Sequence, residues 1–340
     1  MIYLVFPTSW HPSQPYLSLP SLKAFLNMHG VHDVVQRDLA IELLNDLCTW
    51  EKTKPLYERI IRELNELSSR PRLTQVEAEK FNKLREAEEI VMALKDQIDS
   101  AVASQRSQDF YDLDQYMENL KIMDVWLDNI LAPYYPSQLT VIGSQMRFSP
   151  YSSQEVIDSF NHPEENFFYD LYQQWYLPGI LQEDIDILGI SITSVEQIIS
   201  GLTLAYLVKQ NRPEIHITIG GSVFTKLVDR LENDGSPLFD FVDSFIVHEG
   251  ETPLLRLVEH LRGDGDLSKV PNLIYKQDGK VKVNRPFAKE ELNALPTPDF
   301  DGLPLDLYLA PDRVLPVMGS RGCYWEKCAF CSIPFDHMEF

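Results

Sequence analysis

The sequence predicts an α/β fold, a doubly wound parallel sheet that carries a long helical insertion. Five short apolar runs, each typical of a buried parallel strand, alternate with segments that favour helices. Residues 41–128, between the second and third of these runs, are rich in Glu, Lys, Leu, Ala and Gln and have helical periodicity. A hairpin signal, Gln277-Asp278-Gly279-Lys280, follows the last run.

The N-terminus has the pattern of a βαβ unit. Ile2–Phe6 is a continuous apolar run that predicts a buried strand, and Val31–Gln36 predicts a second one. A helix is expected between them over Leu19–His29, with Ser18 as its N-cap and Gly30 as its C-terminal stop. A crossover of this kind is right-handed and joins parallel strands.

Residues 41–179 are expected to form a helical insertion. Thr74–Ser104 has the spacing of one long amphipathic helix, and Asp109–Leu131 that of another, which together predict a helical hairpin. A bundle without chemistry is the simplest interpretation of these helices. Ala132–Pro178 is aromatic and irregular, so it is either a cap with a ligand-facing wall or a segment whose rings only pack.

The α/β pattern then resumes and ends in a proline-bearing stretch. The expected strands are Ile185–Ile192, Ile215–Ile219 and Phe241–Val247, and the expected helices are Val195–Asn211, Phe224–Asn233 and Pro253–Arg262. Leu273–Tyr275 and Val281–Val283 flank the hairpin turn. Residues 291–313 contain four prolines and are predicted to be a linker. Val314–Met318 is then expected to be the first strand of a second domain.

Composition narrows the classes of function. The formal net charge is −21, a surface that repels phosphate backbones and argues against a nucleic-acid partner. The apolar runs are all too short to span a membrane, and the start of the chain lacks the basic region of a signal peptide. Four cysteines, three of them clustered, indicate a metal site in a reducing compartment rather than a disulfide framework. We therefore expect a cytoplasmic protein.

Three loops that follow predicted strands carry polar groups or glycines. Ligands of open α/β sheets bind outside the carboxyl ends of the strands, so these loops predict a large cofactor at the sheet edge. The candidate residues are Ser191, Thr193, Ser194, Val195, Gly220, Gly221, Ser222, Glu249, Gly250, Glu251 and Thr252. Bland alternatives stay open: Ser194 and Thr252 could be helix N-caps, and the glycine pair could be a plain tight turn.

The cysteine loop is the most specific motif. Cys323, Cys328 and Cys331 lie within nine positions, a set of thiolates that suits an iron–sulfur cluster or zinc. Three ligands would leave one iron of a four-iron cluster open to a small molecule, and Phe330 could pack on a flat ring beside it. The alternatives are a zinc knuckle with His337 as fourth ligand and a chance group of inert thiols. Cys48 stands alone and is expected to be a small buried hydrophobe.

Residues 1–40 and 185–331 resemble the cobalamin-binding radical S-adenosylmethionine enzymes. The resemblance rests on the cysteine loop and on segments 15–26 (PYLSLPSLKAFL), 187–191 (ILGIS), 217–221 (ITIGG) and 247–251 (VHEGE). It implies a Rossmann-like cobalamin-binding domain over 1–40 and 180–290, an insertion or cap over 41–179, a linker over 291–313, and the start of a radical S-adenosylmethionine (TIM-like) barrel over 314–340.

The resemblance also implies an activity. Cys323, Cys328 and Cys331 would ligate a [4Fe-4S] cluster, on whose open iron S-adenosylmethionine is reductively cleaved to a 5′-deoxyadenosyl radical. The three sheet-edge loops would hold cobalamin, which typically carries a methyl group to an unreactive carbon of a natural product or peptide. An electron donor such as flavodoxin or ferredoxin would be a partner.

The chain departs from the family pattern in several places. Its cysteine spacing is Cys-x4-Cys-x2-Cys instead of Cys-x3-Cys-x2-Cys, and it has no Asp-x-His-x-x-Gly. His248 stands where a small residue is expected. A barrel needs on the order of 200 residues, so we expect this chain to be part of a larger enzyme and inactive alone. A cobalamin carrier or sensor and a structural zinc protein are the competing interpretations.

Overall fold

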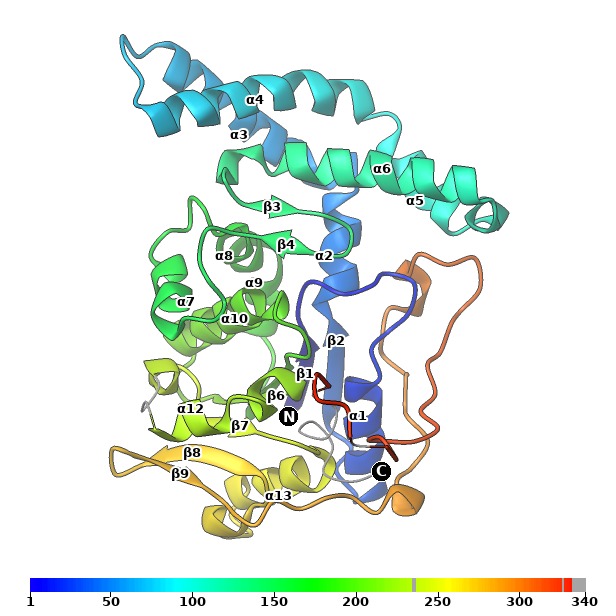
Figure 1. Cartoon of the computed structure of the whole chain (residues 1–340), viewed down its shortest axis with the longest axis vertical. Coiled ribbons are helices and arrows are strands. Elements are labelled where there is room, and N and C mark those ends of the chain that lie inside the picture. The colour runs from blue at the N-terminus through cyan, green and yellow to red at the C-terminus, as the bar shows by residue number, and fades with distance from the viewer. Residues whose placement is uncertain (234–236, 326, 332–340) are drawn as a thin grey trace.

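The computed structural model describes residues 1–233, 237–325 and 327–331. Its centre is a seven-stranded sheet with the order β2-β1-β5-β6-β7-β8-β9 (Figure 1). The strands are β1 Ile2–Phe6, β2 Val34–Asp38, β5 Ile187–Ser191, β6 His216–Gly220, β7 Ser244–Ile246, β8 Leu273–Gln277 and β9 Lys280–Val283. The first five strands in this order are parallel, and β8 and β9 add to the sheet antiparallel. The predicted α/β class and the hairpin are therefore confirmed.

Helices cover both faces of the sheet. Helices α1 (Ser18–Met28) and α13 (Glu251–Leu261) pack on the face that carries Leu4 and Phe6. Helix α10 (Gln197–Asn211) packs on the opposite face, because alternate residues of a strand point to opposite sides. These two apolar cores fix the carboxyl ends of the parallel strands, where the polar loops begin.

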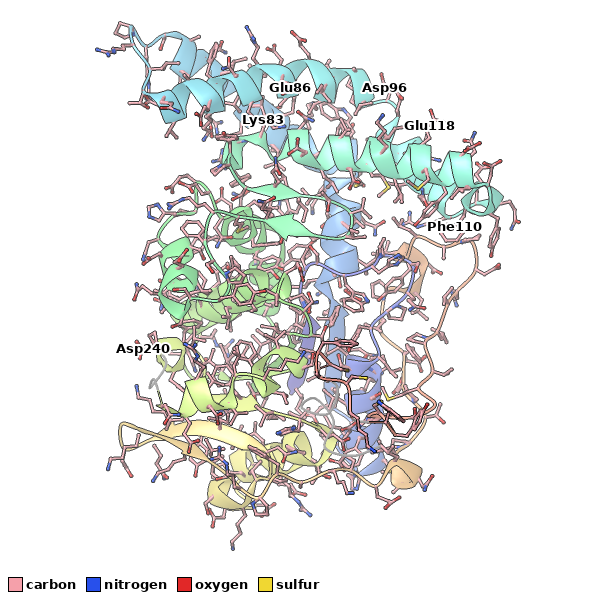
Figure 2. The ribbon with its side chains drawn as sticks, in the orientation of Figure 1. Lys83, Glu86, Asp96, Phe110, Glu118 and Asp240 are labelled. Carbon is pink, nitrogen blue, oxygen red and sulfur yellow. The ribbon has the colours of Figure 1, made fainter. Side chains whose placement is uncertain are left out.

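The helical insertion stands at one end of the molecule, away from the hairpin (Figure 1). Its helices are α2 Leu39–Leu47, α3 Trp50–Ser68, α4 Gln75–Leu94, α5 Ile98–Gln105 and α6 Leu113–Ile130. Figure 2 shows charged side chains such as Glu86 and Glu118 along the exposed sides of α4 and α6. The indole Nε1 of Trp126 donates to the carbonyl of Leu47 at 2.7 Å and ties α6 to α2.

The prediction of one helix over Thr74–Ser104 is wrong. Helix α4 begins after Thr74, whose capping box with Glu77 the sequence encodes, but it ends at Leu94. The amide of Gln97 bonds to the carbonyl of Leu94, which turns the chain before α5 begins. Helix α5 then packs on α6 instead of continuing the line of α4. This tertiary packing is invisible to periodicity, which continues through the turn.

The aromatic segment Ala132–Pro178 is more regular than expected. It contains β3 Gln138–Leu139, β4 Ser144–Gln145, α7 Ser153–Phe160, α8 Phe167–Leu171, a π-helical turn at Tyr172–Tyr176 and α9 Leu177–Ile180. Most of its rings are buried, and Phe160, for example, stacks on Tyr206 of α10 with centroids 4.7 Å apart. Packing therefore explains these aromatics, and none of them lines the sheet-edge pocket described below.

Several predicted helix starts are shifted. Ser18 is the first residue of α1 and not its cap, and Thr252 lies inside α13, which begins one residue earlier. Helix α10 begins at Gln197, so Ser194 is not its N-cap; the Gln197 side chain itself accepts hydrogen bonds from the amides of Thr193 and Ser194. The predicted helix Phe224–Asn233 is divided into α11 (Ser222–Thr225) and α12 (Val228–Asn233).

The prediction of a strand over Val314–Met318 is also wrong for this chain. The segment forms no ladder with any described strand, and its apolar side chains are exposed, with Val317 89% accessible. A strand needs a neighbour to satisfy its backbone groups, and none of the residues that the structure describes supplies one here.

No helix among the described residues has the length and apolar character that crossing a membrane requires.

Part of the predicted linker is docked on the sheet domain. We call residues 299–309 the strap. Its carbonyls at Asp299 and Asp301 both accept from the side-chain amide of Gln36 at 2.8 Å, beside the edge strand β2. Further along, the carbonyl of Leu307 accepts from Asn45 of α2 and from Arg106 at the end of α5. The strap thus joins the sheet, α2 and the insertion.

A buried carboxyl anchors the strap at its end. Asp38 is 2% exposed, and its Oδ1 accepts from the amides of Ala40 and Ile41 at the start of α2. The hydroxyl of Tyr308 donates to its other oxygen at 2.7 Å. Burial raises the pKa of Asp38 to about 6, although these three hydrogen bonds act to lower it.

We expect Asp38→Asn to remove a pH dependence of stability. Because the pKa of Asp38 is raised from 3.8 to about 6 in the native state, its contribution to the free energy of unfolding falls as pH rises through that window. Between pH 4 and pH 7, the free energy of unfolding of the variant should rise by up to about 3 kcal/mol relative to that of the wild type. Urea unfolding across this range measures the difference, with the exposed Asp301→Asn as control. If the difference in free energy of unfolding between the variant and the wild type stays constant with pH, the pKa of Asp38 is not raised in the native state.

Candidate functional site

The polar loops after β5, β6 and β7 meet in one pocket at the carboxyl edge of the sheet. The register places Ser191, at the end of β5, directly opposite Gly220 at the end of β6. The cavity volume is about 200 Å³. Its lining is Leu4, Tyr16–Leu19, Ser21, Leu22, Gly189–Ser191, Thr193, Thr218, Gly220–Ser222, Ile246, His248–Glu251, Leu254, Met318 and Arg321.

The structure brings most of the predicted cofactor residues together. Those that line the pocket are Ser191, Thr193, Gly220, Gly221, Ser222, Glu249, Gly250 and Glu251. Ser194, Val195 and Thr252 lie outside the lining, and Thr252 instead donates from its amide and hydroxyl to the carboxylate of Glu290. Phe330 is also outside the pocket and 93% exposed.

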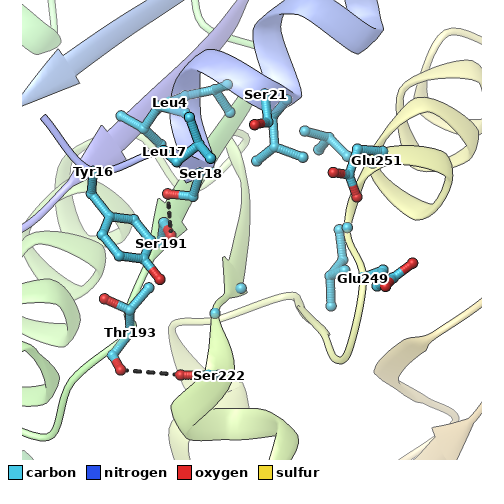
Figure 3. Close-up of a pocket in the computed structure, with 18 of the residues that line it drawn as sticks. Leu4, Tyr16, Leu17, Ser18, Ser21, Ser191, Thr193, Ser222, Glu249 and Glu251 are labelled. Carbon is cyan, nitrogen blue, oxygen red and sulfur yellow. Dashed lines mark hydrogen bonds between the residues drawn. The ribbon is translucent and has the colours of Figure 1, made fainter. Parts of the chain in front are cut away.

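Hydroxyl groups form one wall of the pocket (Figure 3). The hydroxyl of Ser191 donates to that of Ser18 at 2.9 Å, which links β5 to the first turn of α1. Ser222 donates to the carbonyl of Thr193 at 3.1 Å and joins the first two loops. These bonds hold the oxygens in place while their remaining lone pairs are available to a polar ligand.

Aliphatic side chains form the floor. Leu4 and Ile246 come from strands β1 and β7, and Leu19, Leu22 and Leu254 come from the two helices on that face. Gly189 contributes to the depth, because a Cβ there would lie 2.8 Å from Cδ2 of Leu4. An apolar floor with a few fixed hydroxyls suits a flat ring with polar edges.

The two glycines after β6 have different roles. Gly221 has φ +106°, and a Cβ built on it would lie 2.1 Å from the carbonyl oxygen of Ile192. Only glycine fits there, because the backbones of the two loops are in direct contact. A Cβ on Gly220 would meet nothing closer than the carbonyl of Ile246 at 3.8 Å, so this glycine leaves space in the pocket.

The third loop carries a left-handed residue. His248 has φ +59°, a left-handed conformation that few residues other than glycine adopt. Its amide donates to the hydroxyl of Thr225 at 2.7 Å, and its ring lies 4.5 Å from that of Phe287. The turn at His248 directs Glu249 and Glu251 toward the pocket rim (Figure 3).

Two buried glutamates contact one arginine at the rim. Glu249 and Glu251 are 7% and 5% exposed, and Arg321 lies between them. Both terminal nitrogens of Arg321 donate to Glu251, one of them at 3.3 Å, and Nη1 lies 3.7 Å from Oε2 of Glu249. Glu290 lies beside them, and burial together with the charges of Glu251 and Glu249 raises its pKa.

The cysteine loop follows this arginine. Cys328 is exposed and Cys323 and Cys331 are half-buried, with a turn from the Cys331 amide to the Cys328 carbonyl at 3.3 Å. The three sulfur atoms do not converge into a ligand set here. The chemistry of these side chains nevertheless fits an iron–sulfur cluster, because such clusters are held by cysteine thiolates. His337, the fourth ligand of the zinc alternative, lies outside the described residues.

A surface group elsewhere has the geometry of a cation site. Within the described ranges, His162, Glu164 and Glu165 are the set of three His, Cys, Asp or Glu residues whose ligand atoms lie within 4.8 Å of one another. The Glu165 carboxylate already pairs with Arg147, and Nδ1 of His162 lies 2.9 Å from Glu164. Because these exposed side chains already pair with one another or with Arg147, we assign no function to this group.

Sequence reasoning missed part of the lining. Tyr16 stacks on Phe6 with centroids 5.0 Å apart and borders the pocket, and Ser18 and Ser21 come from the first turn of α1. The signal was present in segment 15–26, which belongs to the family resemblance although no ligand role was derived from it. Met318 and Arg321 had no local signal, because only the fold brings them to the sheet edge.

A curated protein matches part of the chain. No family model matches the chain. A protein of Pyrococcus horikoshii named uncharacterized methyltransferase PH0819 is 32% identical to it over 153 residues. These residues are 44% of this chain and 32% of that protein, so the match spans about a third of the relative's length.

Proposed function

We propose that this chain is the cofactor-binding part of a cobalamin-dependent radical S-adenosylmethionine enzyme that transfers a methyl group to a natural product or peptide. The observation that carries the proposal is the convergence of three loops on one pocket whose rim also holds Met318 and Arg321, five and two residues before Cys323. A site for a large cofactor and a metal-binding loop are then neighbours. The name of the Pyrococcus relative supports methyl transfer.

The pocket suits part of a large cofactor. Its volume of about 200 Å³ is below that of a site enclosing a whole drug-sized ligand, so it would take one ring-sized group while the remainder lies over the sheet edge. Ser191, Thr193 and Ser222 would orient the polar edge of that group, and the aliphatic floor would exclude water from it. In cofactor enzymes generally, the protein binds and orients the cofactor, and the cofactor supplies the chemistry.

The cysteine loop would hold the second cofactor. Cys323, Cys328 and Cys331 would bind three irons of a [4Fe-4S] cluster, with S-adenosylmethionine at the fourth. The cluster and the sulfonium supply radical chemistry when bound, with electrons from a donor such as flavodoxin or ferredoxin. Exposed side chains around the loop, such as Tyr324 and Trp325, would be covered by the rest of the enzyme.

Direct binding of S-adenosylmethionine in the sheet-edge pocket is the second candidate. The position of the pocket at the ends of parallel strands and the name of the relative favour it. In that case S-adenosylmethionine would compete with hydroxocobalamin for the pocket. Under our proposal the two ligands do not compete, because they occupy different sites.

Pocket occupancy can be tested with a matched pair of variants. We expect the wild-type chain to bind about one equivalent of hydroxocobalamin in an anaerobic absorbance titration and to co-elute with it in gel filtration. Gly220→Leu should weaken binding at least about tenfold, because the new side chain occupies the pocket. Gly179→Leu, at an exposed position of α9 that does not line the pocket, is the control and should bind like the wild type. Equal binding by all three chains would refute the pocket assignment.

A further inference from the structure

The side chain of Arg321 is mostly buried, whereas the residues just before it are exposed. Val317 is 89% exposed and Met318 is 50% exposed, whereas the side chain of Arg321 is 10% exposed. Behind this segment an open groove separates Val317–Ser320 from residues 292–298. The segment before the cysteines therefore contacts the sheet domain chiefly at its end, through one guanidinium group.

The loop after β7 and the start of α13 supply the acceptor for that guanidinium. Glu251 is the first residue of α13, and Glu249 is held by the backbone amide of Glu290. Both carboxylates are buried, so an empty acceptor would leave two charges without a counter-ion away from water. Burial acts to lower the pKa of Arg321, but the hydrogen bond to Glu251 and the charges of Glu251, Glu249 and Glu290 outweigh it and raise the pKa. Arg321 therefore stays charged in its acceptor.

We propose that Arg321 is a positioning residue that fixes the cysteine loop at the rim of the sheet-edge pocket, with Glu251 and Glu249 as its acceptor. Arg321 and Met318 line the pocket, and Cys323 follows Arg321 by two residues. A ligand that fills the pocket contacts the latch formed by Arg321 and the two glutamates. Pocket occupancy and the placement of the cysteines are then coupled, and this coupling rests on the proposed function because it needs both sites.

The latch can be tested by trypsin without any cofactor. Trypsin must take the arginine side chain into its own pocket, so it cleaves Arg321–Gly322 only when Arg321 has left the glutamates. We expect slow cleavage there in the wild type and at least about tenfold faster cleavage in Glu251→Gln, as initial rates measured by mass spectrometry. Cleavage after Arg313, which pairs with Asp306 at the exposed surface, should not change. Equal cleavage at Arg321 in both chains would overturn the latch.

Two controls keep the result specific. Asp306→Asn removes the exposed partner of Arg313 and should leave cleavage at Arg321 unchanged. If Glu251→Gln does not fold, Arg321→Met is compared with Arg313→Met by maleimide labelling of Cys323 in the metal-free chain. Labelling should be several-fold faster only in the Arg321 variant. An unchanged labelling rate would overturn the latch.

The coupling is tested separately from the latch. Hydroxocobalamin should slow cleavage at Arg321–Gly322 in the wild type, because a filled pocket disfavours opening of its rim. If the ligand binds without slowing cleavage, the coupling is overturned. If it does not bind at all, the proposed function fails, and the ligand-free comparison of the wild type with Glu251→Gln still decides the latch.

Discussion

Replacing Gly221 with alanine is expected to destabilise the chain by at least about 3 kcal/mol. The alanine Cβ would lie 2.1 Å from the carbonyl oxygen of Ile192, and the backbone at φ +106° is strained for any L side chain. The atom in its way belongs to the backbone of the residue directly after β5, whose amide donates to the carbonyl of Gly220, so neither loop can move without disturbing the pairing between β5 and β6. The loss of free energy is measured by urea unfolding.

The neighbouring glycine is the control for this experiment. Gly220→Ala places a Cβ no closer than 3.8 Å to other atoms, so its free energy of unfolding should stay within about 1 kcal/mol of the wild type. The comparison separates the two roles of the pair, since Gly221 permits contact between loops while Gly220 leaves space in the pocket. Similar stability of the two variants would show that the loops are not packed as described.

The second large effect is expected at the cysteine loop. After anaerobic reconstitution with iron and sulfide, the wild-type chain should be brown and hold about four irons. Cys323→Ala, Cys328→Ala and Cys331→Ala should each lose most of the iron, because a cluster with two protein ligands is not retained. Iron analysis after gel filtration and the visible spectrum measure this loss.

Cys48 provides the matched control. It is buried in the insertion, and burial raises the pKa of its thiol, so it stays protonated and cannot bind a metal. Cys48→Ala should keep its full iron content. Stoichiometric zinc and no visible chromophore in the wild type would instead favour the structural zinc alternative.

The sheet could be predicted because its strands are continuous apolar runs and its hairpin has a strong turn signal. Asp278 and Gly279 indeed adopt positive φ at the hairpin turn. The three loops could be predicted because parallel strands place their carboxyl ends at one edge. Helix boundaries were less predictable: the sequence carries a helical pattern through Lys95–Gln97, and only packing on α6 breaks it.

Contacts distant in sequence could not be predicted. Tyr308 reaches Asp38 across 270 positions, and Arg321 reaches Glu251 across 70. Nothing in the local pattern distinguishes these residues from ordinary polar residues of a proline-bearing linker and a loop. The docking of the strap was likewise not predictable, because the four prolines of residues 291–313 suggested a linker. Val314–Met318 is unpaired, although its composition suggested a strand.

The most direct test of the central claim is metal analysis of one reconstituted sample. The chain is loaded anaerobically with iron, sulfide and hydroxocobalamin and passed through gel filtration, and iron and cobalt are then counted per chain. We predict about four irons and about one cobalt in the same protein peak. Iron without cobalt, from a folded chain, would contradict the assignment of the sheet-edge pocket to cobalamin.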